Sequence, residues 1–232
     1  MPVNDVICIP PKDPDWRRSE RKKAASALGL SDVAWWSTDY HDENGIRFVA
    51  AGNGARSPVM TKSGGVIEAT SGAAPSGQVV YKLGDGATFD NPGGLGNPST
   101  SSWYLYARGA LTTAPDANGR VNACGFYDTN GVVGVGFLGA YSTTKWCGRW
   151  NGNNGQVLST VSIDTNAHDF RMWHKASSGL VYIQVDTESP IPTADTLIGA
   201  TLVSTWFVEL FGGAVNQKFH FDRGFFAAQK MT

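Results

Sequence analysis

The fold is decided by a stretch that reads HDFRMWH at residues 168–174, SSG at 177–179 and LVYIQVD at 180–186. Both long runs alternate in side-chain character, and a short Ser- and Gly-containing segment between such runs is typical of a turn. We therefore predict two antiparallel strands joined by a short connection. Alternate residues of a strand share a face, which defines an inward-facing set. That set consists of Phe170, Met172, Val181, Ile183 and Val185.

Strand patterns continue on both sides of this hairpin. The run WYLYAR at 103–108 alternates, with Trp103, Leu105 and Ala107 on one face and Tyr104, Tyr106 and Arg108 on the other. The segment DTNG at 128–131 contains an Asn-Gly pair, which predicts a hairpin turn. Further strands are expected over 46–51, 78–83, 121–127, 132–138, 206–211 and 219–227. Helical periodicity is confined to the N-terminal region, so the sequence predicts a mainly β fold, an antiparallel jelly-roll β-sandwich.

Composition agrees with one β domain and excludes several functions. The chain has 232 residues, and 28 of them are glycine while only 17% are charged, which favours turn-rich β structure. A net charge of -1 argues against nonspecific electrostatic binding of nucleic acid. No apolar run approaches the roughly 20 residues that a membrane-spanning helix needs. The first residues lack the basic and apolar segments of a signal peptide, so we expect synthesis in the cytoplasm without export.

The first forty residues differ from the rest and are expected to form an attachment arm, followed by a sandwich domain over 41–232. In that domain 41–98 is turn-rich and 99–232 holds the clearest strands. Within the arm, Pro14 and Gly29 predict the two ends of one short helix. Its basic run lies between large apolar side chains, a combination typical of protein interfaces. We predict that the arm binds a partner or sister chain through Trp16, Arg17, Arg18, Arg21, Lys22, Lys23, Leu28, Trp35 and Trp36.

Two segments resemble known families. Residues 168–186 resemble the hairpin of concanavalin A-like and laminin G-like sandwiches, in which an aromatic-His strand precedes a strand ending in Val-Asp, and 219–227 is similar to their last strand. Those families usually have Gly after that Asp, where this chain has Thr187. The segment 24–34 is similar to the Ala-Arg-x-Ala-Leu-Gly-Leu-Gly motif of bacteriophage tail-fibre proteins, except that Ala25 stands where Arg is usual and Ser31 where the last Gly is usual.

These resemblances imply a non-enzymatic structural protein of a phage virion. They predict a capsid-decoration or tail- or head-fibre component, located in the virion, bound to capsid or tail proteins through its arm and presenting a lectin-like sandwich outward. Threefold symmetry of fibres and capsid sites implies a homotrimer. The alternative function is a carbohydrate-binding module that recognises a host surface glycan, and a glycan-degrading enzyme is the third.

Motifs for catalysis are missing from the sequence. It lacks the Glu-x-Asp-x-x-Glu segment of laminarinase-like glycosidases and the Gly-x-Ser-x-Gly elbow of serine hydrolases. His168 and His174 lie on one predicted strand, but six residues span about 20 Å there, too far for one metal ion. We therefore predict no enzyme activity, no catalytic residues and no metal centre. Calcium held by the loops that contain Asp85 and Asp128 is the one cofactor to consider.

One segment has the composition of a sugar site, and the cysteines are few. Residues 145–154 combine tryptophan with amide side chains, so glycan contact is one hypothesis, and packing in the core or at a subunit interface is the other. The candidate contact residues are Trp146, Arg149, Trp150, Asn151 and Asn153. Three cysteines cannot form a complete disulfide framework, and reduced thiols are expected. A bridge between Cys124 and Cys147 requires that their strands be neighbours.

Overall fold

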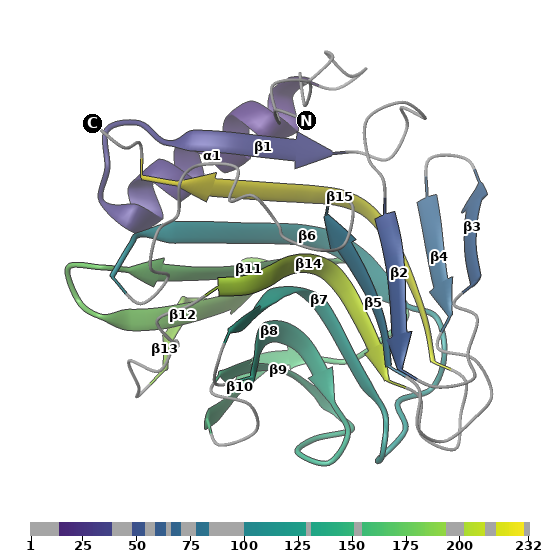
Figure 1. Ribbon diagram of the computed structural model, residues 1–232. Coiled ribbons are helices and arrows are strands. Elements are labelled where there is room, and N and C mark those ends of the chain that lie inside the picture. The colour runs from purple at the N-terminus through teal and green to yellow at the C-terminus, as the bar shows by residue number, and fades with distance from the viewer. Residues whose placement is uncertain are drawn as a thin grey trace.

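Two antiparallel sheets packed face to face dominate the molecule (Figure 1). The computed structural model describes residues 14–38, 48–53, 59–63, 66–70, 78–83, 100–128, 131–150, 155–193, 202–211 and 217–229. Within these ranges it has one helix, α1, and fifteen strands. The mainly β antiparallel sandwich predicted from the sequence is confirmed.

Sheet A contains the hairpin that decided the fold. Its order is β13 (Ile191–Pro192), β12 (Leu180–Val185), β11 (His168–Lys175), β6 (Trp103–Leu111), β15 (Lys218–Ala228), β4 (Val66–Thr70) and β3 (Val59–Ser63). The strand β1 (Ala34–Thr38) also pairs with β15, beyond the end of β4. The β11–β12 register pairs Phe170 with Val185 and Lys175 with Leu180, and Gly179 takes a positive φ of 68° in the turn.

Sheet B is the second layer. Its order is β10 (Gly155–Ser162), β9 (Lys145–Trp150), β8 (Gly131–Leu138), β7 (Arg120–Asp128), β14 (Leu202–Phe211), β5 (Gln78–Leu83) and β2 (Phe48–Asn53). The hairpin predicted around 128–131 is present as β7–β8, with Asp128 opposite Gly131. The thiols of Cys124 on β7 and Cys147 on β9 are buried and free. Strand β8 lies between them, which separates the two backbones by about 9.5 Å and prevents a disulfide bridge.

The main core lies between the two sheets. All five predicted inward residues of β11 and β12 are buried there, together with Trp103, Leu105 and Ala107 of β6. The sheets approach each other closely at Gly148 of β9, where a Cβ atom would lie 2.5 Å from Cγ2 of Ile183. A glycine is required at this position because no larger side chain fits between the layers.

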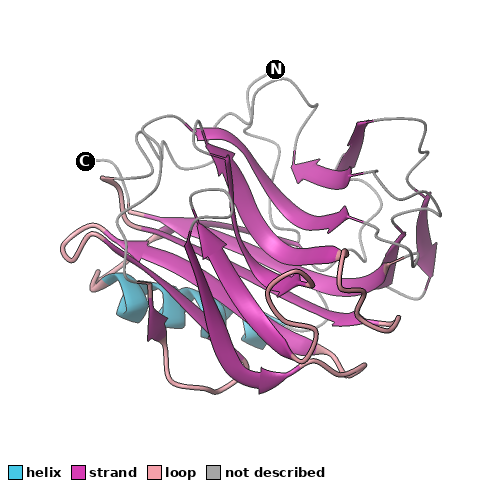
Figure 2. Ribbon diagram, turned by 90° about the horizontal axis from the view of Figure 1, so that it is seen from below, coloured by secondary structure: helices cyan, strands magenta, loops and turns pink. Residues whose placement is uncertain are grey.

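A second, smaller core lies on the outer face of sheet A. Alternation places Tyr104, Tyr106 and Trp173 on that face, and such an aromatic surface is unfavourable in water. Helix α1 (Pro14–Leu28) covers it, packing on β6, β11 and β15 along the outside of the sheet (Figure 2). Gly29 has a φ of 71°, and the amides of Gly29 and Leu30 bond the carbonyls of Ser26 and Ala25, which ends the helix in a Schellman motif.

The predicted division between an arm and a sandwich at residue 40 therefore differs from the structure. Strand β1 is a member of sheet A, with Ala34 opposite Ala228, and α1 lies directly on that sheet. The physical reason is the aromatic outer face of sheet A, which needs a cover supplied by the same chain. Residues 14–38 are thus part of the domain.

Candidate functional site

A buried ion pair joins α1 to sheet A. The side chains of Glu20 on α1 and Arg171 on β11 are each 4% exposed. Arg171 donates from Nε and Nη2 to the two carboxylate oxygens at 3.2 and 2.9 Å. The Tyr104 hydroxyl donates to Glu20 at 2.8 Å, and Lys23 Nζ lies 2.6 Å from its Oε1. Glu20 is therefore the acceptor that fixes the helix on the sheet.

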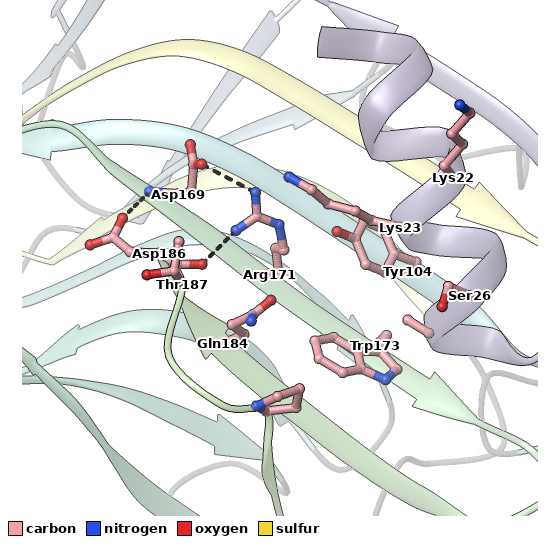
Figure 3. Close-up of a pocket in the computed structure, with 12 residues that line it drawn as sticks. Lys22, Lys23, Ser26, Tyr104, Asp169, Arg171, Trp173, Gln184, Asp186 and Thr187 are labelled. Carbon is pink, nitrogen blue, oxygen red and sulfur yellow. Dashed lines mark hydrogen bonds and ion pairs between the residues drawn. The ribbon is translucent and has the colours of Figure 1, made fainter.

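Arg171 is also held by its own strand and by the following turn. Its Nη1 donates to the carbonyl of Asp186 at 3.0 Å, and its Nη2 donates to Asp169 at 3.1 Å (Figure 3). Burial alone would lower the pKa of Arg171, but hydrogen bonding and charge from Glu20, Tyr104 and Asp169 outweigh it and raise this pKa. The guanidinium is a fixed cation at the centre of the network.

Asp169 extends the network along β6. Its Oδ1 accepts hydrogen bonds from the Tyr106 hydroxyl and from Arg108, both at 3.0 Å. Burial would raise the pKa of Asp169, yet the charge of Arg171 and the bonds from Arg108 and Tyr106 hold it below its usual range. Asp222 on β15 lies 3.8 Å from Arg108, and burial raises its pKa despite the nearby Arg223 and Arg108.

The turn after β12 is shaped by Asp186. This residue has a φ of 55°, a left-handed conformation that glycine usually takes. Its Oδ1 accepts from the Asp169 amide at 2.9 Å, and its Oδ2 lies 2.7 Å from Nδ1 of His168. These bonds compensate the backbone conformation. The positive φ is at Asp186 and not at the next position, so position 187 does not require glycine and can be occupied by Thr187.

A pocket of about 630 Å³ lies between α1 and the β11–β12 hairpin. Figure 3 shows helix side chains on one side and strand and turn side chains on the other. Tyr104 and Tyr182 stack on the Trp173 ring at centroid distances of 6.0 and 5.5 Å and cover its faces. The ring therefore lines the pocket only with its edge. The other lining residues are Lys22, Lys23, Ser26, Ala27, Tyr104, Asp169, Arg171, Gln184, Asp186, Thr187 and Pro190. Most of them carry a polar or charged group, while carbon atoms form the larger part of the exposed pocket wall. The pocket therefore offers hydrogen-bonding groups set in a largely apolar surface.

The predicted assembly residues fall into separate groups in the structure. Trp16, Arg17 and Leu28 are buried against the chain's own sheet, so the prediction that they contact a partner is corrected for these three. Trp16 packs on Tyr106, which shows that it serves the second core. The others are placed as follows: Lys22 and Lys23 line the pocket, Arg18 is exposed, Arg21 bonds Asp32, Trp35 stacks on Phe225, and the Trp36 side chain lies outside the described residues.

The predicted glycan-contact residues do not form a surface site where the structure describes them. Trp146 is fully buried in the main core, with its ring edge-on to Phe170 at 4.8 Å. Arg149 is also buried, 1% exposed. Both are therefore corrected, because a sugar cannot reach a side chain that the protein itself covers. The side chain of Trp150 and the whole of Asn151 and Asn153 lie outside the described residues.

The described residues give no sign of a metal or nucleophilic centre. No group of three His, Cys, Asp or Glu side chains in those ranges could hold a metal ion. Residues 129 and 130 and the loop that contains Asp85, both considered for calcium, lie outside them. His168 contacts Asp186 and Asp164, and His174 Nδ1 lies 2.7 Å from the Ser101 carbonyl. No helix in the described part is both long and apolar enough to span a bilayer.

Comparison with known proteins bears on the fold. No family model and no curated protein matches the sequence. Arcelin-5, a lectin-like defence protein from Phaseolus vulgaris, is 10% identical with a TM-score of 0.54, covering 86% of this chain and 99% of that one. The carbohydrate recognition domain of Emp47p is 14% identical, with a TM-score of 0.52 and coverage of 83% and 95%. A conserved carbohydrate esterase of the Shiga toxin-encoding bacteriophage phi24B is 11% identical, with a TM-score of 0.50 and coverage of 84% and 97%.

These similarities establish a lectin-like jelly-roll sandwich. The neighbours include a carbohydrate recognition domain, a lectin-like protein and one enzyme from a phage. At such low identities the likeness concerns the fold alone, and the function must be argued from the site.

Proposed function

We propose that this protein is a non-catalytic carbohydrate-binding module whose site is the pocket between α1 and the β11–β12 hairpin. The observation that carries the proposal is the pocket itself, about 630 Å³ in volume, which combines apolar surface with polar groups on both of its sides (Figure 3). Pockets for small ligands usually measure about 300 to 1,000 Å³, so a short saccharide is of suitable size.

The side chains that face this pocket have the chemistry that sugar hydroxyls require. Ser26, Gln184 and Thr187 offer hydroxyl and amide groups, and the buried network beneath them holds the floor in place. The covered faces of Trp173 mean that a sugar ring meets its edge and not a stacking platform. Recognition then depends on directional hydrogen bonds. The lectin-like fold of the structural neighbours agrees with this function.

The test blocks the pocket without altering the core. Ser26 is exposed on α1 at the pocket, and Ser26→Trp fills part of the space with an indole ring. Ser19 is exposed two turns earlier on the same helix and does not line the pocket, so Ser19→Trp is the matched control. We expect glycan-array and calorimetric binding to be abolished by the first change and retained by the second. Equal binding by both variants contradicts the proposal, and release of reducing sugar by the wild type contradicts its non-catalytic part.

A virion role is a second proposal. It is supported by the resemblance of residues 24–34 to tail-fibre proteins and by the presence of a phage protein among the structures of similar fold. Attachment to a capsid or tail, and a homotrimeric state, would then use the exposed side of α1, including Arg18. Antibody labelling of phage particles in electron micrographs tests the location, and light scattering after size-exclusion chromatography tests the trimer. Unlabelled particles contradict the location, and a monomeric mass contradicts the trimer.

A further inference from the structure

The carboxylate acceptors around the pocket already have hydrogen-bonding partners within the protein. Glu20 Oε1 accepts from Lys23 and Arg171, and its Oε2 accepts from Tyr104 and Arg171. Asp169 and Asp186 are engaged in the same way, because each of their carboxylate oxygens already accepts a hydrogen bond or contacts a histidine nitrogen. The acidic groups near the pocket are therefore matched by partners inside the protein.

The hydrogen-bond donors on the α1 side of the pocket have fewer partners than these carboxylates. Lys22 is exposed and has no hydrogen bond or ion pair among the described residues. Lys23 Nζ contacts Glu20, but an ammonium group has three donors and this side chain is 49% exposed. Figure 3 shows Lys23 extending from α1 toward Arg171, above the strands that form the floor. The hydroxyls of Ser26 and Thr187 also line the pocket and add further donors, for which the described part of the chain shows no acceptor.

Arg171 lies beneath these donors and is not itself available as a contact for an anion. Four of its five N–H groups are used by Glu20, Asp169 and the Asp186 carbonyl. Its charge is balanced by the carboxylates of Glu20 and Asp169, with which it forms ion pairs. An incoming group that carries negative charge would therefore be met by the ammonium groups of Lys22 and Lys23 at the rim.

We propose that the ligand of this pocket is an anionic saccharide, held by Lys23 and Lys22 through its charged group. This inference rests on the proposed carbohydrate-binding function and specifies its ligand class. An ammonium group recognises charge and not shape, so a uronate carboxylate and a sulfate ester share the required chemistry.

The experiment compares acids with their neutral counterparts. The probes are oligosaccharides of galacturonate and of mannuronate, the same oligosaccharides with their carboxyl groups reduced, and the reduced oligosaccharides bearing sulfate esters. We expect the acidic or the sulfated forms to bind at least about tenfold more tightly than the reduced forms, as measured by calorimetry. The two anionic arms show which of the charged groups is recognised.

Variants then assign the effect to the pocket. Lys23→Gln is expected to weaken binding of the preferred anion about tenfold and Lys22→Gln about threefold, with the reduced sugars unaffected. Arg18→Gln removes the same charge one turn before Lys22, outside the pocket, and is expected to change binding less than twofold. Because Lys23 also bonds Glu20, its variant is checked by thermal melting, and Lys22→Gln provides the independent measurement.

The outcomes separate the inference from the function on which it rests. Reduced sugars that bind as tightly as the anions, in a manner still blocked by Ser26→Trp, overturn the anionic ligand and leave the saccharide function intact. An equal loss from Arg18→Gln and Lys22→Gln also overturns it, because the effect is then one of overall charge. Failure of every saccharide to bind overturns both.

Discussion

The Glu20→Ala variant tests the idea that one buried ion pair holds α1 on the sandwich. Removing the carboxylate leaves the guanidinium of Arg171 buried without its main partner, and breaking a buried pair in this way costs about 3 to 5 kcal/mol. Arg171 keeps its bonds to Asp169 and to the Asp186 carbonyl. We therefore expect a loss near the lower end of that range, about 3 kcal/mol of unfolding free energy.

Urea denaturation followed by circular dichroism measures this loss. The matched control is Arg21→Ala, one position further on α1, which breaks an exposed pair whose side chains are 43% and 39% exposed. That change should cost no more than about 1 kcal/mol. If Glu20→Ala costs as little as Arg21→Ala, the pair does not hold the helix and the reasoning fails.

A double replacement separates charge burial from helix docking. Changing both Glu20 and Arg171 to methionine removes the ion pair but leaves apolar side chains of similar length in the buried space. Such replacements are often neutral or stabilising. We expect the double variant to have a higher unfolding free energy than Glu20→Ala. If its unfolding free energy is lower instead, the hydrogen bonds of Glu20 and Arg171 stabilise the protein by more than each charge neutralising the other.

Three further outcomes follow from burial and packing. Burial raises the pKa of Asp222, so the wild-type protein loses stability as this carboxyl group ionises with rising pH. Asp222→Asn has no such group, so its unfolding free energy minus that of the wild type should increase between about pH 4 and pH 7. Burial raises the pKa of the Cys147 thiol to about 12, so with the other cysteines replaced by alanine it should react with a thiol reagent only after denaturation. Gly148→Ala should cost about 1 to 3 kcal/mol in urea unfolding, because its Cβ would overlap Ile183; an unchanged midpoint contradicts the close approach of the sheets.

The strands and their faces could be predicted because alternation is a local property. Trp103, Leu105 and Ala107 fall on the core side of β6, and the inward set of β11 and β12 fills the space between the sheets, as the period of two requires. The β11–β12 hairpin follows from its own turn residues. Pro14 and Gly29 likewise mark the ends of α1.

The place where the helix docks could not be predicted, because it depends on contacts between distant residues. Glu20 and Arg171 are 151 positions apart, and nothing in either segment identifies the other. A signal was nevertheless present on the outer face of sheet A. Tyr104, Tyr106 and Trp173 stand where a half-solvated sheet would carry polar side chains, which indicates that a further element covers that face.

The glycan hypothesis for residues 145–154 failed at Trp146 for a related reason. Even spacing of tryptophans predicts that they share a face, but not whether that face is turned to solvent or to the opposite sheet. In the structure Trp146 packs on His168 and Phe170 of β11, in the layer opposite its own strand. The polar pocket residues Gln184 and Thr187 lacked any motif, and only the fold brings them to α1.

The position of β15 has a consequence for how the chain is made. This strand is the last of the described strands along the chain, yet it pairs with β6 on one side and with β4 and β1 on the other. Sheet A therefore stays divided during translation until residues 218–228 leave the ribosome. Closure then joins segments from both ends of the sequence, and pairings so far apart in the chain form slowly. Until that step the edges of β6 and β4 that β15 later covers have no partner strand, and such unpaired edges can pair with other nascent chains.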